Sequence, residues 1–361
     1  MTRAGRDAAP FPDTLHGVPS LPSLDIILVC WNHHATIGRC LRSLAEHRVE
    51  GVRVARVVVV DNGSAPPIAF ADETRLPGLE VIGNAGNRGF AAACNQGAAE
   101  SSADYLLFLN PDTRLTPGVI TRAIRALEQP SGCRTGILGV RLVDEHGVVQ
   151  ATCGRFPGAA NVFAQTTGLS RLAPRLFPGM RMTEWPHDDT RDVSFVSGAC
   201  LFARRPLFDA LGGFDERLFV YLEDADLALR AAERGWRTRF VADLEVVHAD
   251  GWSSGRDRAR RLALSWRSQI VYGWKHVGIA GALAVTGTIL LVAPLTRFAD
   301  AVWRRCPKDL LAAGPACVLL WGMLARELAT GRSRRPEEED ANRSRSAEPL
   351  ASPNTAGTPE S

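Results

Sequence analysis

"VARVVVVDNGS", residues 54–64, is the stretch that decides the fold class of this chain of 361 residues. Its four consecutive valines predict a strand buried on both faces, because β-branched side chains favour strands and no polar residue interrupts the run. Asp61 ends the strand, and the Asn-Gly pair after it is a turn signal. The stretch therefore predicts a sheet covered on both sides, with a polar residue at the carboxyl end of a buried strand.

The neighbouring segments alternate between strand and helix patterns. The other expected elements, in chain order, are a strand at 24–31, a helix at 36–47, strands at 79–83 and 103–112 on either side of a helix at 89–101, a helix at 116–129 with Thr116 as N-cap and Pro117 at its first position, and strands at 193–205 and 238–248. This alternation predicts an α/β fold with a mostly parallel sheet covered by helices on both faces. Ligands bind beyond the carboxyl ends of such strands, where Asn32, Asp61 and Asp112 lie.

Composition excludes some classes of protein. The formal net charge is only +3, which gives no broad electrostatic footprint for nucleic acid, so no nucleic-acid partner is expected. The eight cysteines form no C-x-x-C pair and suit a reducing cytosol. Residues 1–23 have no apolar core of a signal peptide and are interpreted as a flexible, Pro-rich lead-in. The Gly- and Pro-rich segment 154–192, in a less regular middle part, is interpreted as a loop or lid.

The last third of the chain contains two apolar runs. Residues 277–295 hold 19 residues without a charge and residues 310–325 hold 16 more, which predicts a helical hairpin at 276–330. The first run is just long enough to span a bilayer and the second is short. Basic residues before, between and after the runs leave two spans and an interfacial hairpin equally open, and a buried core hairpin is a third alternative. Residues 331–361 have the composition of a disordered tail.

Three acids crowd the start of a predicted helix in "GGFDERLFVYLEDADLALRAAERGW", residues 212–236. Glu223, Asp224 and Asp226 would offset the positive end of the helix dipole there. The alternative is that one of them is a catalytic base. Asn110 and Asp112 in "LFLNPDT", and His248 at a strand end, are by themselves typical of turns and ordinary strand ends.

Six motifs carry a resemblance to a known family. They are "VVVVDNGS", "GNRGFAAACNQG", "FLNPDT", "SGACLFARR", "GGFDERLFVYLEDADLALR" and "VVH". In this order, over about residues 24–275, they resemble glycosyltransferase family two, and more closely its bacterial rhamnosyltransferase-like branch. The resemblance implies a GT-A fold and an inverting transferase that uses a nucleotide-diphosphate sugar and Mg²⁺ or Mn²⁺.

The resemblance also implies roles for individual residues. Asp224 corresponds to the catalytic base, Glu223 to a neighbour that tunes its position or the acceptor contacts, and Asp226 is left with helix-start electrostatics. Asp112 corresponds to the metal-binding end of the family's D-x-D motif and His248 to a second metal ligand. The residues expected at the nucleotide are Asn32, Asp61, Asn87, Asn95 and Asn110, and Arg267 and Lys275 are expected near the diphosphate or a lipid-linked acceptor.

Two departures from the family pattern stand out. The D-x-D motif is Asn-Pro-Asp here, and Cys94 stands where many members have an arginine. The expected function is transfer of a sugar, rhamnosyl from dTDP-rhamnose, to a polyprenyl-diphosphate-linked or other glycan acceptor at the cytoplasmic face of the bacterial membrane. The alternative is a non-catalytic sugar-nucleotide or glycan-binding protein with a degenerate site. A dinucleotide-dependent oxidoreductase is excluded, because "WNHHATIG" is not its glycine fingerprint.

Overall fold

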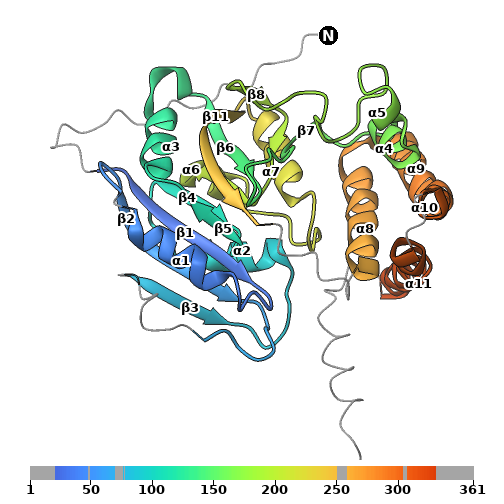
Figure 1. The fold of residues 1–361 in the computed structure, drawn as a ribbon, viewed down its shortest axis with the longest axis horizontal. Helices are drawn as coiled ribbons and strands as arrows, with labels where there is room; N and C mark the ends of the chain where they lie inside the picture. The colour runs from blue at the N-terminus through green and yellow to red at the C-terminus, as the bar shows by residue number, and fades with distance from the viewer. Residues whose placement is uncertain are drawn as a thin grey trace, which may run out of the picture.

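The structure is a computed structural model that describes residues 21–47, 49–69, 76, 78–249, 258–303 and 307–330. A sheet covered by helices forms one part of the molecule, and a group of helices from the last third of the chain lies beside it (Figure 1). Most of the expected lead-in and all of the expected tail at 331–361 lie outside the described residues.

The main sheet has nine strands. They are β1 (Ser23–Cys30), β2 (Arg53–Asp61), β3 (Leu79–Gly83), β4 (Tyr105–Leu109), β5 (Thr113–Leu115), β6 (Thr135–Val143), β8 (Arg191–Val193), β10 (Cys200–Arg204) and β11 (Arg237–His248). Their order is β3-β2-β1-β4-β10-β6-β11-β5, with β8 also paired to β11. Strands β1 to β4 and the β6–β11 pair run parallel, whereas β10 runs antiparallel between β4 and β6.

Helices cover both faces of this sheet. α1 (Ile37–Glu46) and α3 (Val119–Glu128) pack on the face that receives Leu28, while α2 (Phe90–Ala98) and α7 (Glu223–Ala232) pack on the face that receives Val29. Successive side chains of β1 thus enter two separate cores, as the period of two of a strand requires. The predicted α/β class, with a mostly parallel sheet between two helical layers, is confirmed.

Three local expectations were wrong. The helix expected from Thr116 begins at Val119, after Gly118 in the left-handed conformation, and the Thr116 hydroxyl instead donates to the carbonyl of Glu245. The central strand β6 lies in the part expected to be irregular. The segment 154–192 is partly helical rather than a loop, with α4 (Ala159–Thr167) and α5 (Leu169–Leu172), and α4 packs against the C-terminal helices.

The C-terminal helices are α8 (Arg258–His276), α9 (Gly278–Gly287), the π-helical turn η5 (Thr288–Val292), α10 (Ala293–Trp303) and α11 (Pro307–Thr330). Together α9, η5 and α10 make a continuous helix, of which Gly278–Val302 is the one stretch among the described residues that is long and apolar enough to cross a membrane. α11 packs against α8 and α10, so the expected helical hairpin forms. The domain boundary expected after residue 275 stays a prediction.

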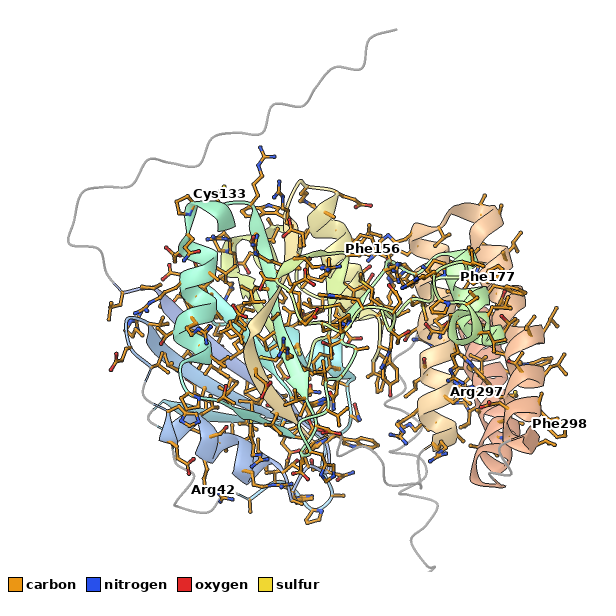
Figure 2. The ribbon with its side chains drawn as sticks, turned by 45° about the horizontal axis from the view of Figure 1, so that its top comes forward. Arg42, Cys133, Phe156, Phe177, Arg297 and Phe298 are labelled. Carbon is orange, nitrogen blue, oxygen red and sulfur yellow. The ribbon has the colours of Figure 1, made fainter. Side chains whose placement is uncertain are left out.

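One side of this helical group is packed, whereas the other side exposes apolar side chains. Val285, Ile289 and Ala293 are buried against Trp266 and Ile270 of α8. An outer apolar face lies on the opposite side, where Figure 2 labels Phe298 on α10. Its members are large exposed apolar side chains, namely Ile279, Leu283, Leu291, Leu295, Phe298, Val302, Val318, Trp321 and Leu328. Because only one side is packed, the hairpin is not the fully buried core hairpin that was one of the alternatives.

Candidate active site

The turn before α7 has an unusual backbone. Tyr221 and Leu222 both have positive φ, 71° and 67°, although neither is a glycine. Such left-handed residues carry a conformational cost and persist only where their surroundings enforce them. The next two residues are Glu223 and Asp224, so this strained turn directly precedes the two acids considered as a catalytic base and its neighbour.

Asp224 is the more accessible of the two acids. Its Oδ2 accepts a hydrogen bond of 3.0 Å from the backbone N–H of Gly198, and its Oδ1 accepts one of 2.8 Å from Ala225. The side chain is partly exposed, in contrast to buried Glu223. Burial of the turn raises the pKa of Asp224 above its ordinary value, while the backbone N–H groups act in the opposite direction. A carboxylate whose pKa is raised is a stronger proton acceptor than an ordinary aspartate.

Glu223 is buried, and no ion pair joins it to another residue in the described part of the chain. One carboxyl oxygen, Oε2, has no hydrogen-bond partner among the described residues. Burial raises the pKa of Glu223 well above its ordinary value, and the charge of Asp224 raises it further. Burial likewise raises the pKa of the Cys94 thiol, with Glu223 as the second cause, so Cys94 lies near this carboxyl group. The pair thus favours one charge on Asp224 and a neutral Glu223.

Asp112 and His248 are brought together at the carboxyl edge of the sheet. His248 ends β11 and Asp112 precedes β5, and the antiparallel pairing of these strands places the two side chains with Nε2 3.3 Å from Oδ1. Gln150 fixes the imidazole from the other side, because its Oε1 lies 2.8 Å from Nδ1. The Gln150 oxygen accepts a hydrogen bond from Nδ1, and Nε2 faces Asp112 and Asn110, whose Nδ2 lies 3.4 Å away; in the neutral imidazole Nε2 is then the nitrogen that can bind a metal.

Backbone contacts join this pair to the acids of α7. The N–H of Asn110 donates to the carbonyl of Ala199 at 2.9 Å. The residue before Ala199 is Gly198, whose N–H donates to Asp224. Since β10 runs antiparallel to β4, its start and the end of β4 meet at the same edge of the sheet. Asp112, His248 and Asp224 therefore lie at the same edge of the sheet.

The donor set fits a hard divalent cation. Within the part of the chain that the structure describes, no group of three or more His, Cys, Asp or Glu residues could hold a metal. Mg²⁺ and Mn²⁺ do not need such a cage, because they are held by one or two protein ligands together with water and substrate phosphates. An imidazole whose other nitrogen is fixed by Gln150, next to a carboxylate, has the outer-shell support that such ligands require.

Asp61 and Asn32 lie at the ends of β2 and β1. The carboxylate of Asp61 accepts hydrogen bonds from the N–H groups of Ser64 and Ile68, at 3.0 and 2.8 Å. Asn32 accepts one from Ala65 through its side chain, and its own N–H donates to the Ser64 hydroxyl. Both residues thus shape the loop that follows β2. Their contact with a nucleotide stays a prediction.

The two other asparagines have different surroundings. Asn87 accepts hydrogen bonds from the side chain of Asn62 and from the N–H of Gly89, at 3.1 and 2.9 Å. Gly89 is required there, since its φ is +87° and a Cβ would lie 2.6 Å from the ring of Phe219. Asn95 instead makes a two-way bridge to the backbone of Phe214, 2.9 Å in each direction. Asn95 therefore ties α2 to the segment before the acids.

Arg267 and Lys275 on α8 are paired with acids of the protein. The guanidinium of Arg267 contacts Glu327 of α11 at 2.5 Å, and the ammonium of Lys275 contacts Asp215 and Asp226 at 2.6 and 2.5 Å. Their expected contact with a diphosphate stays a prediction.

Sequence reasoning missed several residues of this site. Burial lowers the pKa of His33, and the charge of Asp112 acts in the opposite direction, so this histidine lies near the candidate metal ligands. Gln150, which orients His248, and Arg181, whose charge opposes the larger effect of burial on the pKa of Asp224, come from the irregular middle part. The "WNHH" stretch contained a signal for His33, but nothing in the sequence singled out Gln150 or Arg181.

Comparison with known proteins identifies the family of this chain. A sequence model described as "Glycosyltransferase like family 2" matches residues 22–267. The chain belongs to this family. Family membership confirms the resemblance carried by the six motifs and makes the protein a glycosyltransferase with a GT-A-type α/β architecture.

Relatives of this family-2 protein include a rhamnosyltransferase. It is 28% identical over 300 residues to N-acetylglucosaminyl-diphospho-decaprenol L-rhamnosyltransferase of Mycobacterium tuberculosis, covering 76% of this chain and 94% of the relative. It is 30% identical over 239 residues to an O-antigen biosynthesis protein of Myxococcus xanthus, covering 64% of this chain and 18% of the relative. A mannosyltransferase of Pyrobaculum calidifontis, solved with GDP-Man and Mn²⁺, is 17% identical with a TM-score of 0.46 and covers 86% of this chain and 81% of its own.

Proposed function

We propose that this family-2 glycosyltransferase transfers rhamnosyl from dTDP-rhamnose to a hydroxyl of a polyprenyl-diphosphate-linked saccharide with inversion. The observation that carries the proposal is the placement of accessible Asp224 on the same edge of the sheet as the Asp112–His248 pair. The first can take a proton from the acceptor hydroxyl, and the second faces the place where a donor diphosphate leaves. The relative that acts on a decaprenol-linked sugar supports this choice of acceptor.

Each residue has a task in the proposed reaction. Asp224, held by the N–H of Gly198, accepts the hydroxyl proton as the oxygen attacks the anomeric carbon. Buried Glu223 stays neutral beside it and limits the negative charge near the incoming oxygen. Asp112 and His248 would hold Mg²⁺ or Mn²⁺, which supplies positive charge to the leaving diphosphate. Asp61, Asn32 and Asn87 shape the loops at the expected nucleotide side.

The test is turnover of a panel of nucleotide-sugars by the purified full chain, with and without Mn²⁺ and with N-acetylglucosaminyl-diphospho-polyprenol as acceptor. We expect metal-dependent transfer from dTDP-rhamnose and none from the other donors. Transfer from a different donor would overturn the choice of sugar. Failure to bind any donor, with or without metal, would favour the alternative of a non-catalytic protein with a degenerate site.

The outer apolar face supports association with the cytoplasmic face of the bacterial membrane. Leu291 and Leu295 are 68% and 71% exposed, and Leu328 is 86% exposed. An apolar surface shared by two long helices is typical of a membrane or protein interaction site. A lipid-linked acceptor never leaves the bilayer, which makes a lipid surface the partner that the proposed reaction needs.

Vesicle flotation tests this membrane association. Replacing Leu291, Leu295 and Phe298 by serine should release the protein from vesicles that contain anionic lipid. The matched control replaces three exposed apolar residues of the sheet part, Val81, Val148 and Val149, by serine and should leave binding unchanged. Equal binding of both triple variants would exclude the outer apolar face as the contact surface.

A further inference from the structure

A stripe of polar residues on α8 contacts the segment that leads into the candidate base. The hydroxyl of Ser268 donates to the carbonyl of Val220 at 2.7 Å, and Arg267 donates to the carbonyl of Arg217 at 2.9 Å. Near the end of the helix, Lys275 contacts both Asp215 and Asp226. Arg267 and Ser268 are almost fully buried, so these contacts are shielded from water.

These contacts lie before and after the strained turn in the chain. Arg217 and Val220 come just before the left-handed pair Tyr221 and Leu222, and Asp226 follows in the first turn of α7. On the side of the nucleotide loops, the N–H of Phe90 donates to the carbonyl of Phe219 at 2.7 Å. Two consecutive non-glycine residues with positive φ need this kind of enforcement from several directions.

Asp226 makes several of the contacts that hold this segment in place. It is fully buried, and its carboxylate contacts Lys275, His276 and Arg230, at 2.5, 2.6 and 2.7 Å. Lys275 and His276 come from the end of α8, whereas Arg230 lies one turn further along α7. The same Arg230 donates to the carbonyls of Leu211 and Gly213, which joins the start of the segment to α7.

We infer that α8 is the positioning element for the base, with Ser268, Arg267 and Lys275 as positioning residues that fix where Asp224 points. The inference rests on the proposed function and deepens it. It assigns to Arg267 and Lys275 the task of holding the turn, in place of binding the diphosphate. Glu327 of α11 holds Arg267 in turn, so the last long helix supports the same turn.

The central experiment compares Ser268→Ala with Ser265→Ala. Both changes remove one hydroxyl from α8, but Ser265 lies one turn earlier, where its oxygen accepts only a long contact of 3.5 Å from Gln269. Ser268→Ala should lower kcat roughly 10- to 100-fold, because a small misplacement of a catalytic group has effects of this size. The donor Kd should stay unchanged, and Ser265→Ala should behave like wild type in both measurements.

Variants of Lys275 distinguish a role in positioning the base from a role in donor binding. Lys275→Met should lower kcat without weakening donor binding, and Lys275→Arg should restore most of the loss because it keeps the charge near Asp226. Weaker donor binding by Lys275→Met at unchanged kcat would overturn the inference in favour of a diphosphate contact. If Ser268→Ala has an unchanged kcat and only a lower melting temperature, α8 stabilises the fold but does not position the base.

The two proposals fail in different ways. If the wild-type chain transfers no sugar, the proposed function fails, and the positioning of a base fails with it. If the wild type is active and Ser268→Ala has the same kcat, the function stands and only the role of α8 is wrong. Circular dichroism and melting curves of each variant identify a loss of activity that comes from unfolding.

Discussion

The first turn of α7 contains two kinds of carboxylate only two residues apart. Asp226 contacts two cations, Arg230 and Lys275, and the imidazole of His276. Although burial alone would raise the pKa of Asp226, hydrogen bonding to His276 and the charges of Arg230 and Lys275 lower it. Among the residues that the structure describes, Glu223 and Asp224 meet no such partners at hydrogen-bond distance, and burial raises the pKa of both. One helix start thus holds an acid with several basic partners and a pair with raised pKa values, so the partners of each acid, and not its position in the helix, set the direction of its pKa shift.

The largest expected effect separates the two kinds of acid through activity. Asp224→Asn should lower kcat by about 10²–10⁴-fold, because the amide keeps the shape but cannot accept the proton. Donor binding, measured by calorimetry, should remain because the Asp112–His248 pair is unchanged. If the Asp224→Asn enzyme is active, Asp224 is not the catalytic base, and the difference between Asp224 and Asp226 has no consequence for activity.

The next effect concerns stability. Asp226→Ala should lower the free energy of unfolding by about 3 kcal/mol at pH 7, since it leaves Lys275 and His276 in a largely buried position without their shared partner. The lowered pKa of Asp226 gives a stabilisation that is complete above its unfolded value and is lost as the pH falls through its folded value. Urea unfolding of wild type and variant between pH 3 and pH 7 measures this difference, which should shrink at acid pH.

Glu223 should behave in the opposite way. Its raised pKa means that the folded state favours the neutral acid, so its contribution to stability is present below the unfolded pKa and declines as the pH rises through the folded one. Glu223→Gln keeps a neutral side chain of the same shape and should be more stable than wild type by about 1 kcal/mol at pH 8, with no difference at pH 4. A variant that is less stable than wild type at pH 8 would show that Glu223 is charged and has a partner.

The sequence predicted the valine-rich strands and the polar residues at their ends because those features are local. It could not predict β6, whose Gly136 and Gly139 weaken the strand pattern for a tertiary reason. A Cβ at Gly139 would lie 2.5 Å from Val196, and one at Gly136 would lie 2.2 Å from Leu207. These glycines leave room for packing partners distant in the chain.

The sequence also could not predict which residues contact Asp226 and His248, because these contacts join segments that are distant in the chain. Asp226 and Lys275 are 49 residues apart, and the Gln150 that orients His248 is 98 residues away from it. Motif resemblance therefore predicted Asp112, Asp224 and His248 as a set, but assigned Asp226 mainly to helix-start electrostatics. Its contacts with Lys275 and His276 arise only when the end of α8 meets α7, which no local pattern in either segment indicates, whereas Arg230 lies on α7 itself, four residues further along.

The smallest expected effect tests whether burial, rather than pairing as such, gives Asp226 its importance. Arg217 also forms an ion pair, 2.7 Å from Asp215, but its side chain is 54% exposed. Such pairs contribute little because water and salt screen them, so Arg217→Ala should cost less than about 1 kcal/mol. The backbone carbonyl that receives Arg267 remains in this variant, and kcat should therefore stay at the wild-type value. A loss of stability comparable to that of Asp226→Ala would mean that exposed and buried pairs of this cluster act as one network, whose coupling a double-mutant cycle between Arg217 and Lys275 would measure.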